Sequence, residues 1–137
     1  MASSPTPREA RRSFAGTTAS IGEARRFVRE TVADVADRAE LVGDLELAVS
    51  ELVTNAVEHG LAEPLTVNVV VTADPPSVGI SVRSVRSSSG IADPSTWSGP
   101  LPAVRTGRGL AIVRAVSDAV SVDADDETVT VHCTFRI

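Results

Sequence analysis

Three polar side chains recur every four residues in the segment 50–60: Glu51, Asn55 and His59. An α-helix turns by about 100° per residue, so residues four apart lie one above another on one face. The amide oxygen of Asn55 is a hard ligand of the kind that Mg²⁺ takes beside its water molecules. The carboxylate of Glu51, one turn away, is placed to accept a proton from an attacking hydroxyl group. The stripe predicts the lining of a cleft that binds a cation, and a solvated helix face is the alternative.

The elements that would position this stripe can be predicted from the hydrophobic pattern. An amphipathic helix is predicted from Ser20, with a capping box to Glu23, to about Ala36, and a second from about Arg38 to Glu58. The apolar side of the second helix borders the stripe and comprises Leu41, Leu45, Ala48, Val49, Leu52 and Val53. This side is expected to face the core.

The remaining segments change to the pattern of strands. β-branched runs at 65–72, 78–82, 120–123 and 128–137 predict four strands, and a short strand is expected at 12–16. Between them, 84–106 is a long Ser-, Gly- and Pro-rich loop, and a third helix is expected after Gly109. Helices grouped against such strands predict a two-layer α/β sandwich of the α+β type, with the helices on one face of a mixed, mostly antiparallel sheet.

Length, net charge and cysteine content limit the classes of protein to which this chain can belong. The 137 residues suit one domain over 12–137, preceded by a disordered tail over 1–11. The net charge of -5 argues against a nucleic-acid binder, and no apolar run is long enough to span a membrane. The single Cys133 permits no internal disulfide or cysteine-based zinc site. We expect a cytoplasmic protein.

A second candidate site is the glycine segment at the start of the third helix. Gly107 and Gly109 would let the backbone approach a ligand closely, and a helix N-terminus offers free N–H groups to an anion. Alone, this pattern is more typical of a plain loop-to-helix junction than of a ligand site.

The segment from Glu51 to His59 resembles the N-box of the GHKL ATPase superfamily, which includes gyrase, histidine kinases and MutL. Within it, LAVSELVTNAVEHG is most similar to the anti-sigma-factor serine kinases, and the similarity in element order extends over most of 20–137. The resemblance implies the Bergerat, or histidine-kinase-like ATPase, fold. It also implies that ATP is bound, with Asn55 ligating Mg²⁺, Glu51 acting as the general base and His59 shaping the nucleotide pocket.

The resemblance extends to the two glycine boxes of the family. The second box is matched by Gly107, Arg108, Gly109 and Leu110, which would contact the triphosphate, with the preceding loop as the ATP lid. In the first box an aspartate should accept a hydrogen bond from the adenine amino group, but Ser84 stands there. Thr128 or, preferentially, Thr130 would match a threonine that relatives place beside adenine.

Two functions are compatible with this pattern. The resemblance implies an anti-sigma-factor protein serine/threonine kinase, which sequesters a sigma factor and phosphorylates an anti-sigma-factor antagonist. The alternative is a non-catalytic partner-switch binding module of the same fold, which Ser84 favours, whereas Glu51, Asn55 and the glycines favour the kinase. The relatives commonly dimerise, so a homodimer is among the expectations. The catalytic part of a histidine kinase fits poorly, since no upstream helical hairpin carries a phosphoacceptor histidine.

Overall fold

The computed structural model describes residues 8–59, 63–73, 75–85 and 105–137, apart from the side chains of His59 and of residues 105–109. Along these residues the chain forms five strands and three helices in the order that the sequence predicts. The elements are β1 (Arg8–Phe14), α1 (Ala19–Val32), α2 (Ala39–His59), β2 (Leu65–Ala73), β3 (Pro76–Val85), α3 (Arg105–Val116), β4 (Ala119–Ala124) and β5 (Thr128–Arg136). Of the predicted loop, residues 86–104 lie outside the described part.

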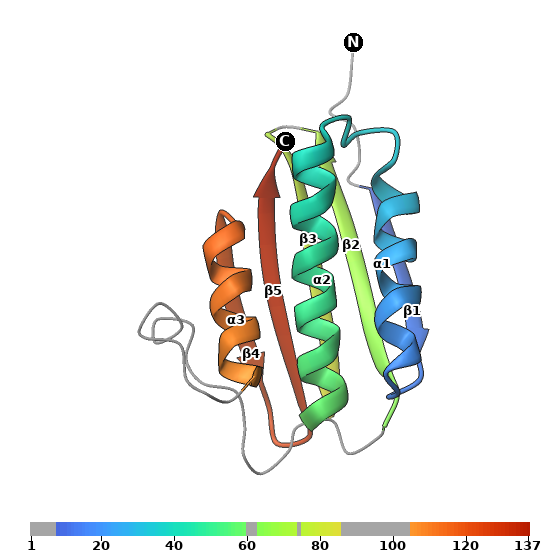
Figure 1. Ribbon diagram of the computed structural model, residues 1–137, viewed down its shortest axis with the longest axis vertical. Coiled ribbons are helices and arrows are strands. Elements are labelled where there is room, and N and C mark those ends of the chain that lie inside the picture. The colour runs from blue at the N-terminus through green and yellow to red at the C-terminus, as the bar shows by residue number, and fades with distance from the viewer. Residues whose placement is uncertain (1–7, 60–62, 74, 86–104) are drawn as a thin grey trace.

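The five strands form one sheet in the order β1-β2-β3-β5-β4, and every neighbouring pair is antiparallel. Figure 1 shows the three helices side by side over one face of this sheet. The predicted two-layer sandwich is therefore confirmed. The described strands contain no parallel pair, so the sheet is more regular than the mixed sheet that the sequence suggested.

The core lies between the helices and this face of the sheet. Strand β2 alternates buried and half-buried side chains because its valines at every second position point to one side. Val67, Val69, Leu45 and Val49 are fully buried, from both layers. Burying a side chain of this size contributes about 1.5–3 kcal/mol before the entropy cost of ordering it. The predicted apolar side of α2 thus holds this helix against the sheet.

The start of α1 differs from the prediction. The helix begins at Ala19, and Thr18 at the N-cap makes no side-chain capping bond. Ser20 is buried, and its hydroxyl donates a hydrogen bond to the carbonyl oxygen of Ala15 at 2.6 Å. The predicted capping box with Glu23 is therefore wrong, because the Ser20 hydroxyl is already used by the preceding turn. Helix α1 also ends at Val32, four residues earlier than expected.

Two other element boundaries are corrected. Strand β1 begins at Arg8, so residues 8–11 belong to the sheet and not to the disordered tail predicted over 1–11. Helix α3 begins at Arg105, so Gly107 and Gly109 lie within the helix and do not precede it. In both cases the polar or glycine-rich composition predicted irregular backbone where the structure has a strand or a helix. Tertiary contacts decide the conformation there more strongly than local propensity.

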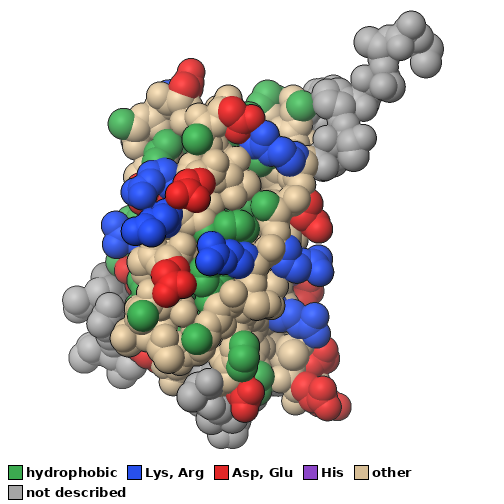
Figure 2. Space-filling model, turned by 90° about the vertical axis from the view of Figure 1, so that its right-hand side faces the viewer, with side chains coloured by type: hydrophobic (Ala, Val, Ile, Leu, Met, Phe, Trp, Pro, Cys, Tyr) green, Lys and Arg blue, Asp and Glu red, His purple; other side chains and the backbone are tan. Residues whose placement is uncertain are grey.

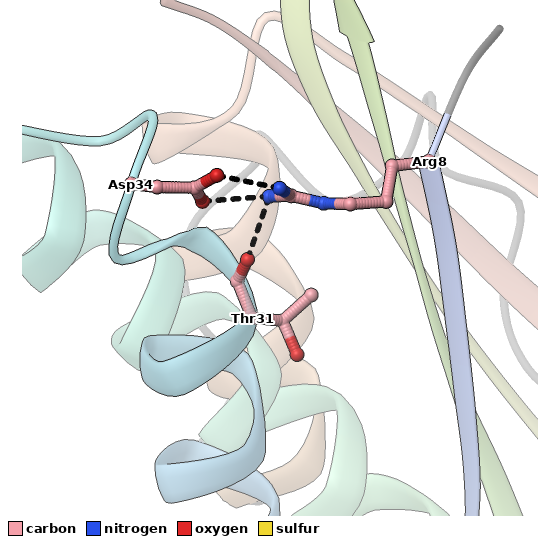
Figure 3. Close-up of polar contacts among 3 residues, drawn as sticks. All are labelled: Arg8, Thr31 and Asp34. Atoms are coloured by element: carbon pink, nitrogen blue, oxygen red, sulfur yellow. Dashed lines mark hydrogen bonds and ion pairs between the residues drawn. The ribbon is translucent and has the colours of Figure 1, made fainter.

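Strand β1 is fastened to the helix layer by Arg8. Its guanidinium group donates two hydrogen bonds to the carboxylate of Asp34, at 2.6 and 2.8 Å, and one to the carbonyl oxygen of Thr31 at 2.9 Å (Figure 3). The hydrogen bond from Arg8 is the main cause that lowers the pKa of Asp34, and the same bond raises the pKa of Arg8. Water screens this exposed pair, so it sets geometry more than stability.

The edge of the molecule formed by β1 and α1 carries charges of both signs. Figure 2 looks onto this edge and shows arginine and acidic side chains interspersed over it, without one large patch of a single sign. None of the helices in the described residues is long and apolar enough to cross a membrane.

Candidate functional site

Asn55 lies in the last third of α2 and is buried, with only 4% of its surface exposed. Its carbonyl oxygen Oδ1 has no hydrogen-bond partner among the described residues. Leaving a buried polar atom without a partner costs about 1–3 kcal/mol, so such atoms are uncommon away from functional sites. The side chain does not belong to a solvated helix face, and the cleft lining is the better interpretation.

The neighbouring polar residues of α2 behave differently. The hydroxyl of Thr54, which is also buried, donates to the carbonyl oxygen of Ser50 at 2.7 Å. The hydroxyl of Ser50 in turn donates to the carbonyl oxygen of Glu46 at 2.7 Å. These hydroxyls are satisfied within their own helix, whereas Asn55 Oδ1 has no partner among the described residues.

Glu51 lies one helical turn before Asn55 and is half-buried. The adjacent Leu52 is almost fully buried against the core. Glu51 thus stands at the border between the core and the surface, where a carboxylate keeps contact with water and can still reach a ligand beside Asn55. His59 is the last residue of α2, and its side chain lies outside the described part of the chain.

Ser84 occupies the end of β3 on the face that the helices cover. It is 8% exposed, and its cross-strand partner in β5 is the buried Val129. Directly paired residues of an antiparallel sheet point to the same side. The side chain of Ser84 therefore points toward the helix layer, on the same side of the sheet as Asn55.

Thr130 does not join this site, which corrects the sequence-based assignment. Its cross-strand partner is the exposed Arg83, and both point to the face of the sheet that carries no helices. Thr128 has the same orientation, two residues earlier in β5. Because successive side chains of a strand alternate, the buried positions on either side of Thr130 are Val129 and Val131. A threonine in this strand cannot reach a ligand held between the sheet and α2.

The glycine segment lies at the beginning of α3. Gly107, Arg108 and Gly109 occupy the first turns of this helix, and the next residue, Leu110, is buried in the core. The first four N–H groups of a helix have no partner within that helix. The buried Leu110 side chain anchors the beginning of α3 against the core.

Figure 1 shows that the C-terminal end of α2, the C-terminal end of β3 and the beginning of α3 lie at the same end of the molecule. The elements that carry Asn55, Ser84 and the Gly107–Gly109 segment are therefore brought together, although they are far apart in the sequence. Of the predicted site residues whose side chains the structure describes, Thr130 lies on the opposite face of the sheet.

The donor set can be compared with the requirements of Mg²⁺. No group of three or more His, Cys, Asp or Glu side chains in the described residues could hold a metal ion. Mg²⁺ does not need such a cage, because it keeps several waters and takes one or two protein oxygens besides phosphate oxygens. The buried, unpartnered Oδ1 of Asn55 is an oxygen of this kind. The residues present fit Mg²⁺ bound together with a phosphate-bearing ligand.

The structure also reveals a polar chain of hydrogen bonds that was not found in the sequence. On the helix-free face, Ser81 Oγ lies 2.7 Å from His132 Nδ1, and His132 Nε2 lies 2.9 Å from Asp123 Oδ2. Three different strands contribute these residues. The alternation within β3 and β5 would have placed Ser81 and His132 on one face, but only the register of the strands makes them partners.

The sequence profile of the histidine kinase-like ATPase domain family matches residues 14–135. No curated protein sequence matches the chain.

Two solved structures share the fold. One contains the RsbU and RsbW domains of Rv1364c from Mycobacterium tuberculosis, with a TM-score of 0.70 and 24% identity over 96% of this chain. This chain spans 33% of that longer one. The other is the SiaB–SiaC complex from Pseudomonas aeruginosa, with a TM-score of 0.65 and 14% identity over 90% of this chain and 89% of that chain.

Proposed function

Since the chain belongs to the histidine kinase-like ATPase domain family, we propose that it binds ATP with Mg²⁺ and works as a cytoplasmic regulator of the partner-switch type. In this proposal the nucleotide lies between α2, the end of β3 and the beginning of α3. The buried and unpartnered Oδ1 of Asn55 is the observation that carries it. A side chain in that state is expected where an external ligand completes its bonding.

The proposed division of roles follows the position of each residue. Asn55 Oδ1 would hold Mg²⁺, which when bound neutralises the charge on the phosphate oxygens. The free backbone N–H groups at the start of α3, among them that of Gly107, would donate hydrogen bonds to the triphosphate. Ser84 would meet the base from the floor of the pocket, and His59 would shape its rim.

Glu51 is proposed as the general base of a protein serine/threonine kinase. Its carboxylate would accept the proton of a serine or threonine hydroxyl while that oxygen attacks the γ-phosphorus and ADP leaves. The half-buried position of Glu51, one turn from Asn55, suits this role because the carboxylate can face both the bound nucleotide and an incoming protein chain.

The proposed protein partners are a sigma factor, which the domain would sequester, and an anti-sigma-factor antagonist, which it would phosphorylate. The fold shared with the RsbW-containing structure and with the SiaB–SiaC complex supports protein partners of this type. The alternative is a non-catalytic binding module. It is favoured by Ser84, because a buried hydroxyl lacks the charge that a carboxylate brings to a hydrogen bond with the base.

Calorimetric titration of ATP with Mg²⁺ tests the proposal. We expect saturable binding by the unmodified chain and none by Asn55→Ala. Glu51→Gln should keep nucleotide affinity but lose phosphoryl transfer to an antagonist, because it removes the proton acceptor only. If the unmodified chain does not bind ATP at millimolar concentration, the nucleotide proposal is wrong and the binding module remains. If Glu51→Gln transfers phosphate as fast as the original, Glu51 is not the base.

A further inference from the structure

The face of the sheet that carries no helices has a hollow of about 430 Å³ that the proposed function does not use. It lies across the sheet from Asn55, so a ligand bound there would not share the nucleotide site. Its walls consist of two neighbouring cross-strand rows, each made of one residue from β1, β2, β3 and β5. The register of four strands therefore builds this hollow.

The first row joins four residues that pair directly from strand to strand. Its members are Arg11, Asn68, Ser81 and His132. The second row lies two residues away along each strand. Its side chains point to the same side of the sheet, because side chains alternate along a strand. Its members are Ser13, Thr66, Arg83 and Thr130.

The side chains that line the hollow are all hydrogen-bond donors. They carry two guanidinium groups, an imidazole, a carboxamide and four hydroxyls, and every one of these groups can donate a hydrogen bond. The lining includes no carboxylate and no apolar side chain. A hollow lined by donors and positive charge selects a ligand that is rich in acceptors and negatively charged.

His132 is held in a fixed orientation within this hollow. Its Nε2 faces the carboxylate of Asp123 at 2.9 Å, and its Nδ1 faces the hydroxyl of Ser81 at 2.7 Å. When only Nε2 carries a proton, the Ser81 hydroxyl donates to Nδ1; when Nδ1 also carries one, it donates to Ser81 Oγ and leaves the hydroxyl hydrogen for a ligand. In both forms Asp123 and Ser81 fix the orientation of the imidazole ring.

Two carboxylates lie near the rim and interact with the arginines. Glu9 forms an ion pair with Arg11 at 3.6 Å, and both side chains are more than half exposed. The pKa of Asp125 is lowered mainly by hydrogen bonds from the backbone N–H groups of Thr128 and Glu127, and the charge of Arg83 contributes to the same shift. A guanidinium group has five N–H donors, and water screens these exposed contacts, so both arginines keep donors for an anion.

The hollow also contains one hydrogen-bond acceptor without a described partner, the Oδ1 atom of Asn68. Asn68 donates a long hydrogen bond of 3.5 Å to Glu9, while its Oδ1 is buried and has no partner among the described residues. Anionic oxygens of a ligand would accept hydrogen bonds from the donors that line the hollow, and a hydroxyl of the ligand would donate to Asn68 Oδ1. Phosphate and its monoesters have this composition near neutral pH, because their second proton dissociates there.

We propose that this hollow is a second ligand site, which binds a phosphate group through Arg11, Arg83 and the hydroxyls between them. The phosphate group belongs to inorganic phosphate or to a small phosphate monoester. The site is independent of ATP binding, because the whole sheet separates it from α2 and α3.

The test is a titration of inorganic phosphate into the full chain, at constant ionic strength, followed by amide NMR shifts. We expect saturable shifts at the backbone amides of Ser81 and His132. Arg83→Gln and Arg11→Gln should each weaken binding about three- to tenfold, the range for exposed charge-assisted contacts. Arg25→Gln is the matched control, since Arg25 is exposed on α1 in the helix layer, and it should leave the affinity unchanged.

Two further arms separate this site from the nucleotide site and identify the source of the phosphate group. Asn55→Ala should abolish the response to ATP and keep the response to phosphate, so the two proposals can fail independently. O-phosphoserine should give the same shifts as phosphate, and serine none; shifts with phosphate alone restrict the site to the free ion. Shifts that are absent, that are confined to α2 and α3, or that weaken equally in Arg25→Gln overturn the proposal.

Discussion

Replacing Asn55 by leucine should stabilise the free protein, although the residue is proposed to be essential for function. The unpartnered Oδ1 of Asn55 costs about 1–3 kcal/mol of folding free energy, and leucine of similar size removes that cost. Leucine also favours the helix by a few tenths of a kcal/mol. We therefore expect Asn55→Leu to raise the free energy of unfolding by about 1 kcal/mol.

Denaturant and thermal unfolding without nucleotide would measure this change. For a chain of this size, about 1 kcal/mol corresponds to a rise in Tm of about 3–5 °C. The matched control is Thr54→Val; Thr54 directly precedes Asn55 in α2, and its hydroxyl donates to the carbonyl oxygen of Ser50 at 2.7 Å. That variant should lose about 0.5–1 kcal/mol, because a satisfied hydrogen bond disappears.

The same two variants should respond in opposite ways to ATP with Mg²⁺. A ligand at a hundredfold its Kd stabilises the folded state by about 2.7 kcal/mol. Thr54→Val should show this gain, and Asn55→Leu should show none. A loss of stability in Asn55→Leu as large as in Thr54→Val would refute the reasoning, because Oδ1 would then have a structural partner. Unchanged ATP affinity in Asn55→Leu would remove the residue from the site.

Two other predictions concern single residues on the helix-covered face. Ser84→Asp should tighten ATP binding about tenfold, since a charged acceptor replaces a neutral one; calorimetry that shows no gain would mean that Ser84 does not meet the base. Cys133 should react with a chromogenic disulfide reagent at pH 8 only after unfolding, because burial raises the pKa of its thiol to about 12 and the nucleophilic thiolate is scarce. Rapid reaction of the folded protein would contradict the burial of Cys133 in β5.

The helical part of the candidate site could be predicted from sequence for a simple physical reason. The period of the α-helix fixes the relative directions of Glu51 and Asn55 once the helix itself is known. The apolar residues beside them, such as Leu52, then indicate the direction of the core. Even so, the sequence could not show that Asn55 Oδ1 lacks a partner, since this depends on every element packed around it.

The strand residues were harder to assign. A shift of one residue turns a side chain to the other face of a sheet, so the register decides that Val129, and not Thr130, faces the helix layer. The polar hollow on the other face needs the register of four strands, and no local pattern contains that information. The start of β1 was missed because Arg8, Glu9 and Arg11 look like a solvated tail, whereas the sheet uses them at its edge.

The Arg8 anchor bears on how the domain can be shortened. A fragment that starts at residue 12 would lose Arg8 and more than half of β1. Strand β2, with valines at 67, 69, 70 and 71, would then be left largely as an open edge, where the row of free N–H and C=O groups invites pairing between molecules. By covering this edge, the charged strand β1 should reduce aggregation. An expression fragment should therefore include Arg8.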